Sequence, residues 1–239
     1  LTITANNVTG GSDSIYQPDG IYAKNGGSGA LSITVSGDVT GADEGIDAFT
    51  SAQSTSMYIE ANNVYSLGDA AYENGIVAFH RGTLGVEVKA TGKVSSTGDD
   101  GIYAYNSSNS AEGIILDVND VDGALGDGID ARNSGSGDLT ITANNVTGGT
   151  DGIYADNDGS GTLSITTTGT VEGTAGYGIY ANNSINSTQD LTITANGGVT
   201  GGKNAIGALN YGTGNLSIET NGEVTNNAVE YAAIAAVAG

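Results

Sequence analysis

The chain of 239 residues contains 40 glycines, two phenylalanines and no tryptophan, so its core has to be built from Ile, Leu, Val and Ala. Acidic residues number 27 against six Lys and Arg, which gives a formal net charge of −21. Such a surface excludes nucleic acid and anionic membranes as partners, because both bind clustered cations. The lack of cysteine excludes disulfides and thiolate metal sites, and no apolar run is long enough to span a membrane.

A phrase of three parts recurs nine times along the chain. It consists of a Leu-Thr-Ile-Thr-like segment, a Val a few residues later, and then Gly-Ile-Tyr-Ala or a close variant. The Ile of the third part recurs every 24 to 30 residues, at Ile21, Ile46, Ile76, Ile102, Ile129, Ile153, Ile179, Ile206 and Ile234. A fixed period between about 20 and 50 residues is typical of solenoids, propellers and stacked arrays.

Each part of the phrase reads as a short strand. In segments such as 139–142, Leu and Ile alternate with Thr, as expected for a half-buried strand. The period of two and the frequent glycine disfavour helix, and a propeller blade needs about 40 residues. We therefore predict an all-β chain, a parallel β-helix (solenoid) of about nine coils with three short strands each. Residues 1–239 are expected to form a single repeat domain that is a segment of a longer chain.

Asparagine recurs four residues after the Ile in six of the nine coils. Asn tolerates the left-handed backbone of a turn, and stacked amides can bond the Asn above and below. The pattern predicts a structural Asn ladder at one corner, formed by Asn25, Asn106, Asn133, Asn157, Asn183 and Asn210. The single histidine, His80, stands in the same register and is expected to replace a turn residue there.

The sequence contains few residues suited to catalysis, with one His and no Cys, and we predict no catalytic residues and no enzyme activity. The six cations are scattered along the sequence, whereas polysaccharide-cleaving β-helices need clustered acids beside a basic residue. No metal site and no cofactor are predicted. Calcium is the one ion the composition allows, because oxygen-rich turns suit Ca²⁺ and aspartates flank the Gly-Ile strands at Asp43, Asp47, Asp99, Asp100, Asp127, Asp130, Asp151, Asp156 and Asp158.

Two places are expected to carry recognition. Long connections between Val8 and Ile21 and between Val64 and Ile76 should leave the solenoid as loops. The middle residue of the Ile-x-Ala strand should point outward, and a row of exposed Tyr with neighbouring Asp suits sugars or a protein partner. The predicted binding residues are Tyr22, Tyr103, Tyr154, Tyr180, Asp47 and Asp130. Ordinary strand composition explains the same row equally well.

The repeated Asp-Gly-Ile-Tyr-Ala, followed by Leu-Thr-Ile-Thr-Ala-Asn-Asn-Val-Thr-Gly, resembles the passenger repeats of large Gram-negative autotransporter and adhesin proteins. The similarity covers the whole chain. It implies a right-handed parallel β-helix exported to the bacterial cell surface, without enzymatic activity, that acts in adhesion or in binding host proteins.

We therefore expect an extracellular, adhesin-like β-helix that displays a binding surface. Its partner would be a protein or glycan of a host or neighbouring cell, or further copies of the chain. The alternative is a structural subunit of a surface fibre whose coils stack end to end, because uncapped terminal strands invite pairing. A polysaccharide-active β-helix enzyme is the third possibility.

Overall fold

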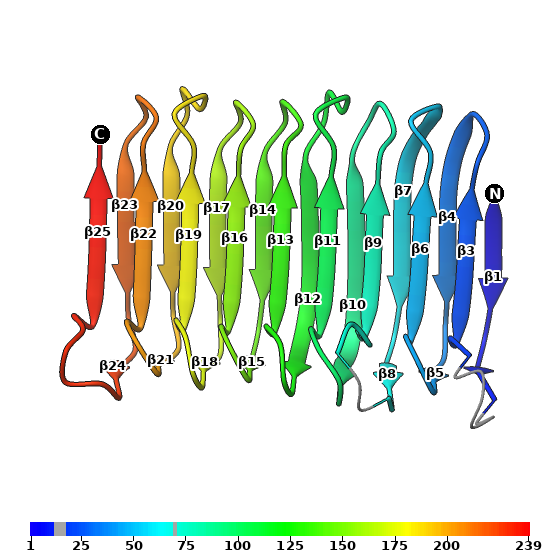
Figure 1. Cartoon of the computed structure of the whole chain (residues 1–239), viewed down its shortest axis with the longest axis horizontal. Coiled ribbons are helices and arrows are strands. Elements are labelled where there is room, and N and C mark those ends of the chain that lie inside the picture. The colour runs from blue at the N-terminus through cyan, green and yellow to red at the C-terminus, as the bar shows by residue number, and fades with distance from the viewer. Residues whose placement is uncertain (12–17, 69–70) are drawn as a thin grey trace.

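The computed structural model describes residues 1–11, 18–68 and 71–239. This part of the chain is all-β and stacks its strands in parallel as a β-solenoid of about nine turns, which confirms the predicted fold class (Figure 1). The three strands of each coil are divided over two sheets of 16 and nine strands. The described residues include no helix that could cross a membrane.

The larger sheet holds the first and second strands of the coils. Its first strands are β1 (Thr2–Ala5), β4 (Gly29–Val35), β7 (Ser54–Ala61), β10 (Val86–Ser96), β12 (Ile114–Gly123), β14 (Leu139–Ala143), β17 (Leu163–Thr167), β20 (Leu191–Ala195) and β23 (Leu216–Thr220). Its second strands are β2 (Val8–Thr9), β5 (Val39–Gly41), β8 (Val64–Ser66), β15 (Val146–Gly148), β18 (Val171–Gly173), β21 (Val199–Gly201) and β24 (Val224–Asn226). In β10 and β12 the two strands run together as one.

The smaller sheet holds the third strand of every coil. Its members are β3 (Ile21–Asn25), β6 (Ile46–Thr50), β9 (Ile76–His80), β11 (Ile102–Asn106), β13 (Ile129–Asn133), β16 (Ile153–Asn157), β19 (Ile179–Asn183), β22 (Ile206–Asn210) and β25 (Ile234–Ala238). The strands of both sheets run across the long axis, and the two termini lie at opposite ends of the solenoid (Figure 1).

Equivalent positions of successive coils stack directly on one another. Ile129 pairs with Ile153, and Val146 with Val171, so each inward side chain meets its counterparts above and below. The Leu, Ile, Val and Ala of the repeat are almost all fully buried in the central coils. Full burial of one Ile or Leu contributes about 1.5–3 kcal/mol. The core is therefore a continuous column of small and medium aliphatic side chains, as the composition requires.

Glycine before the Ile is needed for close approach between coils. A Cβ on Gly128 would lie 2.6 Å from the carbonyl oxygen of Gly152 and 2.5 Å from Cγ1 of Val146. Both distances are shorter than van der Waals contact allows, so a side chain here would push neighbouring coils apart. The glycine at this position of the repeat thus follows from the stacking distance of the backbone.

Five of the six predicted asparagines form one continuous chain of side-chain hydrogen bonds. Each Nδ2 donates to Oδ1 of the Asn in the next coil at 2.9–3.1 Å, in the order Asn106, Asn133, Asn157, Asn183 and Asn210. The same amides also donate to carbonyls of their own turns, as Asn157 does to Gly161 at 2.9 Å. All five are buried, and the ladder pairs most of their amide groups, whereas Oδ1 of Asn106, at the end of the series next to His80, has no hydrogen-bond partner among the described residues.

The ladder ends before the first coils, and Asn25 lies outside it. Asn25 donates to the carbonyl of Gly29 in its own turn, as ladder members do, but it has no Asn partner in the next coil because Thr50 occupies that position. His80 stands in ladder register with Asn106, is fully buried, and has Nδ1 2.7 Å from Oγ1 of Thr50. Burial lowers the pKa of the His80 imidazole. Both long connections expected to carry recognition lie partly outside the described residues.

Candidate functional site

The outward face of the nine-stranded sheet carries two rows of side chains that run along the solenoid. The first row follows the Ile of each third strand and contains Tyr22, Asp47, Val77, Tyr103, Asp130, Tyr154, Tyr180 and Gly207. The second row lies two residues further on and contains Lys24, Phe49, Phe79, Tyr105, Arg132, Asp156, Asn182 and Leu209. Only the first row was predicted from the sequence.

An aromatic stripe crosses the first coils of this face, formed by Tyr22, Phe49, Phe79 and Tyr105. Successive ring centroids are 6.3, 5.9 and 4.7 Å apart, and the last pair is stacked. The guanidinium of Arg81 lies 5.0 Å from the centroid of Phe79. Three of the four rings belong to strands β6, β9 and β11, and both phenylalanines of the chain are among them. The stripe therefore gathers rare, large side chains on one outward face.

Further along the same face lies a second aromatic group. Tyr154 and Tyr180 are stacked with centroids 5.0 Å apart, and Tyr177 lies 5.2 Å from Tyr180. Burial and neighbouring ionisable groups raise the pKa of Tyr180 to about 12. Two of the predicted binding tyrosines are therefore in contact with each other.

The predicted binding residues differ in how open they are. Tyr22 is 59% exposed, whereas Tyr103, Tyr154, Tyr180 and Asp47 are half-buried. Asp130 is only 4% exposed, so it cannot contact a partner as an open side chain. The reason is Arg132, two residues further along the same strand, whose guanidinium makes a bidentate contact with the Asp130 carboxylate at 2.7–3.2 Å. The same guanidinium lies 5.1 Å from the ring centroid of Tyr154.

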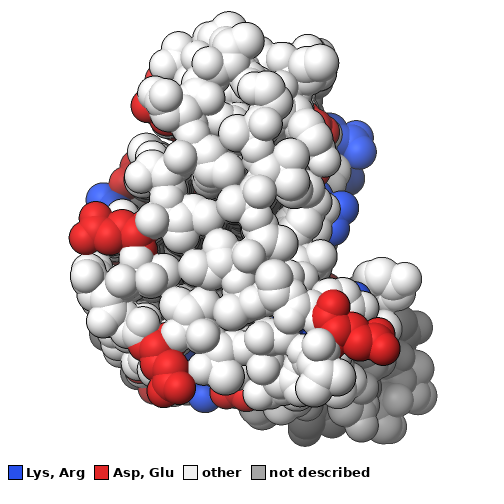
Figure 2. Space-filling model, turned by 90° about the vertical axis from the view of Figure 1, so that its left-hand side faces the viewer, with Lys and Arg blue, Asp and Glu red and all other residues white. Residues whose placement is uncertain are grey.

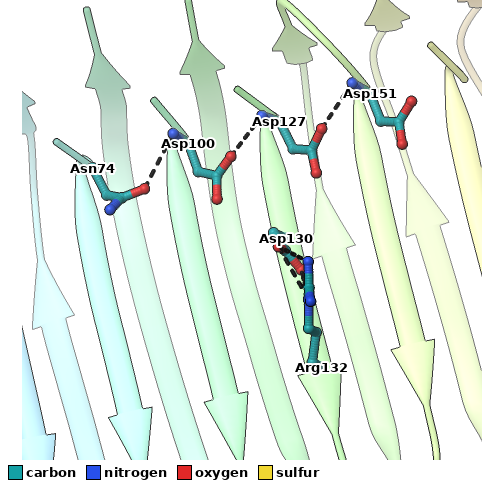
Figure 3. Close-up of polar contacts among 6 residues, drawn as sticks. All are labelled: Asn74, Asp100, Asp127, Asp130, Arg132 and Asp151. Carbon is teal, nitrogen blue, oxygen red and sulfur yellow. Dashed lines mark hydrogen bonds and ion pairs between the residues drawn. The ribbon is translucent and has the colours of Figure 1, made fainter. Parts of the chain in front are cut away.

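An acidic column borders the aromatic face, where the residue before each Gly-Ile stands. Its members are Asn74, Asp100, Asp127 and Asp151 (Figure 3). Each side-chain oxygen accepts a hydrogen bond from the backbone N–H of the next member, at 3.1, 2.7 and 2.9 Å. Asp151 continues the series by accepting from the N–H of Tyr177 at 2.6 Å. The column thus links successive coils through hydrogen bonds from backbone N–H groups to side-chain oxygens, in addition to the side-chain bonds of the Asn ladder.

Burial of these carboxyls outweighs the hydrogen bonds they accept. It raises the pKa of Asp100 to about 8 and that of Asp127 to about 7, and nearby aspartates add to both shifts. The pKa of Asp151 is raised by the same cause. Desolvation disfavours the charged form, and one hydrogen bond does not compensate for it. At neutral pH the column is therefore partly protonated.

An acidic groove of about 620 Å³ lies between the stripe and the column. Its walls include Phe79, Tyr103, Asp100, Asp127 and Arg132, and the remaining lining residues are Phe49, Tyr72, Asn74, Val77, Asp99, Gly126, Asp130 and Thr150. A second hollow of about 490 Å³ adjoins it through Phe49 and Phe79 and contains Lys24 and Arg81. Volumes of this size are typical of ligand sites.

Of the aspartates considered for calcium, only Asp47 joins a group of three carboxylates within the described residues. Oxygen atoms of Asp19, Glu44 and Asp47 lie within 4.8 Å of one another. Burial, with the charges of Asp19 and Asp43, raises the pKa of Asp47 to about 7. Burial, and the hydrogen bond that the protonated Glu44 carboxyl donates to Asp19, raise the pKa of Glu44 to about 9. Protonation thus relieves the repulsion among these groups.

The groove corrects one argument from the sequence. The cations are scattered in the chain, yet folding places Arg132 beside Asp100, Asp127 and Asp130. Its pairing with Asp130 raises the pKa of the guanidinium further, so Arg132 cannot act as a general base. The arrangement can hold charge and bind aromatic or cationic groups, and the carboxyls of Asp100 and Asp127, with pKa values of about 8 and 7, can gain or lose a proton near neutral pH.

The residues missed by sequence reasoning are those of the second outward row, above all Phe49, Phe79 and Tyr105. The available signal was the period of two, which sends the second and fourth residues of each third strand to the same face. Comparison of the chain with models of protein families, with curated proteins and with solved structures finds no match.

Proposed function

We propose that this protein is a non-enzymatic β-helix of the bacterial cell surface that binds a partner through the outward face of its nine-stranded sheet. The observation that carries the proposal is the aromatic stripe with the acidic groove beside it. Aromatic side chains bury large areas on contact and are enriched among the residues that dominate binding energy. The resemblance to adhesin passenger repeats supports the cell-surface location and the role in adhesion.

The scaffold suits this role because it holds the rings in fixed order. Phe49, Phe79 and Tyr105 project from neighbouring parallel strands, whose backbones are hydrogen-bonded in register. Binding to a preformed face costs little conformational entropy, since the side chains are already in contact with one another. The stripe therefore offers a partner a rigid apolar strip bordered by charge.

Replacement of the stripe should weaken binding strongly without unfolding the chain. In the variant Phe49→Ser, Phe79→Ser, Tyr105→Ser, we expect labelled protein bound to cultured epithelial cells, bacterial cells or immobilised glycans to fall roughly tenfold, because hot-spot aromatics are removed. Bound fluorescence on each surface measures this. Circular dichroism and thermal melting report whether the fold is retained.

The control variant removes three large side chains from turns elsewhere, which are more exposed than the three half-buried rings replaced in the stripe. Leu125, Ile185 and Tyr211 are exposed and lie outside both hollows. Their replacement by Ser should leave binding unchanged. Equal binding by the stripe variant and the control variant, or no binding of the unaltered protein to any surface, would contradict the proposal.

A polysaccharide-active enzyme is the second candidate, favoured by one observation. The raised pKa values of Asp100 and Asp127 keep these groove carboxyls partly protonated at neutral pH, as a general acid requires. Incubation with acidic polysaccharides, with and without Ca²⁺, separates the two functions. We expect no new reducing or unsaturated ends, and their appearance would replace the binding function with catalysis.

The fibre alternative depends on the ends of the solenoid. The end formed by β23, β24 and β25 is mostly uncharged, with charged side chains at its margins (Figure 2). Its apolar residues include Ile234, 40% exposed, and Val237, 48% exposed. Either a further coil of the same chain or a second copy of the chain would cover these apolar residues. The end of the solenoid therefore gives no reason to prefer a fibre over binding through the outward face of the nine-stranded sheet.

A further inference from the structure

The acidic groove is short of positive charge. Asp99, Asp100 and Asp127 each accept a backbone N–H bond, from Tyr72, Asp127 and Asp151 respectively. Within the described residues, none of these three carboxylates forms an ion pair with Lys or Arg. Arg132, the cation in the groove, is already held by Asp130. A partner that brings a cation into the groove would therefore meet three carboxyl groups that form no ion pair among the described residues, although the charge of Arg132 also acts on Asp127.

The chain itself shows how such a cation is held on this face. The planar guanidinium of Arg132 pairs with the carboxylate of Asp130 and lies over the ring of Tyr154. Arg81 lies over Phe79 in a similar way. A guanidinium suits this environment better than an ammonium, because it pairs with carboxylates in a bidentate manner, stacks on rings and is less strongly hydrated. In the groove, Asp100 and Asp127 stand beside Tyr103 and Phe79, which repeats the same combination of carboxylate and ring.

We infer that the acidic groove binds an arginine-bearing segment of a partner protein, whose guanidinium pairs with Asp100 and Asp127 and stacks on Tyr103 or Phe79. This inference rests on the proposed function and names the chemistry of its partner. The net charge of −21 draws basic partners toward the whole surface. The groove adds selectivity, since its rings distinguish arginine from lysine. The raised pKa values of Asp100 and Asp127 leave both carboxyls partly protonated at neutral pH. A bound guanidinium favours their charged form, so they lose their protons when the arginine binds.

The probe is a fluorescein-labelled synthetic peptide of alternating Arg and Gly, with Lys-Gly and citrulline-Gly peptides for comparison. Fluorescence anisotropy at pH 8 and physiological salt measures the dissociation constants. We expect the Arg peptide to bind several-fold more tightly than the Lys peptide, and the neutral citrulline peptide not to bind. The variant Asp100→Asn, Asp127→Asn should weaken the Arg peptide roughly tenfold. Asn retains the oxygen that accepts the backbone N–H, as Asn74 does in the same column.

The control variant Asp138→Asn, Asp190→Asn removes the same charge from exposed carboxylates that also accept backbone N–H bonds. Both pairs change the formal net charge from −21 to −19, and at pH 8 the groove pair removes somewhat less charge because Asp100 has a pKa of about 8, so general attraction falls no more in the groove variant than in the control. The inference is supported if only the groove pair weakens binding. It is overturned if both pairs weaken binding alike, if neither does, or if Arg and Lys peptides bind equally.

The two proposals fail in different ways. If the stripe variant loses cell binding while the groove pair leaves the Arg peptide unaffected, the arginine inference is wrong and the proposed function stands. If the groove pair loses the Arg peptide while the stripe variant keeps cell binding, the groove binds guanidinium groups and the proposed function of the stripe is wrong.

Discussion

Stability against urea should rise as the pH falls from about 9 to 6.5. In the folded chain the pKa values of Asp100 and Asp127 are about 8 and 7, well above the ordinary value of 3.8. The folded state therefore binds more protons than the unfolded state between pH 4 and 8. By linkage, each such group makes the chain less stable as pH rises through this window. Asp47, whose pKa is about 7, acts in the same direction.

Histidine limits the gain at the acidic end. Burial lowers the pKa of His80, so protonation of its imidazole favours the unfolded state once the pH falls below its ordinary value of 6.5. We therefore expect the urea midpoint to rise most clearly on the alkaline side of neutrality and to level off below it.

The carboxyls of the acidic column can be tested one at a time. Asp100→Asn or Asp127→Asn should stabilise the chain at pH 8.5 by about 1–2 kcal/mol after allowance for solvent screening, and change it little at pH 5. The thermal midpoint should rise by about 2–4 °C for each kcal/mol. The physical reason is that Asn keeps the accepting oxygen and removes the desolvated charge.

Asp138→Asn is the matched control, because the exposed Asp138 carboxylate accepts the N–H of Thr162 in the next coil at 2.8 Å. Its effect should stay within about 0.5 kcal/mol at both pH values. Loss of stability in Asp127→Asn at pH 8.5 would mean that the charged carboxylate stabilises the column, and our interpretation of the pKa shift would be wrong.

Interrupting the Asn ladder should lower the free energy of unfolding more than a substitution on the surface does. Asn157 is fully buried, donates to Gly161 and Asn183, and accepts from Asn133, all at 2.9 Å. Asn157→Ala removes these bonds and leaves the Asn183 Oδ1 atom without the donor below it. Because an unsatisfied buried polar group costs about 1–3 kcal/mol in addition to the lost bonds, we expect a loss of about 2–4 kcal/mol in urea unfolding.

Asn186→Ala provides the comparison, since Asn186 is exposed in the turn after β19. Its effect should remain within about 0.5 kcal/mol. Fluorescence and circular dichroism should be recorded together, because solenoids can unfold in parts. If the two variants are equally stable, the ladder contributes only to the shape of the corner and not to the stability of the chain.

The fold was predictable because its signals are local and repeated. The alternation in segments such as 139–142 identifies strands, and the recurrence of Ile129 and Ile153 one period apart gives the stacking register. Each coil repeats the same pattern, so a single departure from it does not change the predicted fold. Ile115 in β12, which stands where most coils have Thr or Ser, is such a departure. Asn ladder members could be named for the same reason.

The site was less predictable because it depends on contacts between unlike residues in different coils. The sequence pattern revealed the first outward row. The predicted strand ended at the Ala of Ile-x-Ala, so Phe49 and Phe79, which follow that Ala, were missed. The burial of Asp130 could not be foreseen, since it requires Arg132 to fold back toward its own strand. The raised pKa of Asp100 likewise arises from packing, which residue type alone does not reveal.

The direction of the backbone hydrogen bonds has a mechanical consequence. In a parallel solenoid these bonds run from coil to coil, along the long axis, and the two termini lie at opposite ends (Figure 1). A tensile load applied between the termini therefore pulls the bonds of one coil apart at a time instead of shearing many together. Under such a load the end coils should peel away in sequence at low force, and the chain would act as an extensible tether whose released coils can wind back when the tension falls.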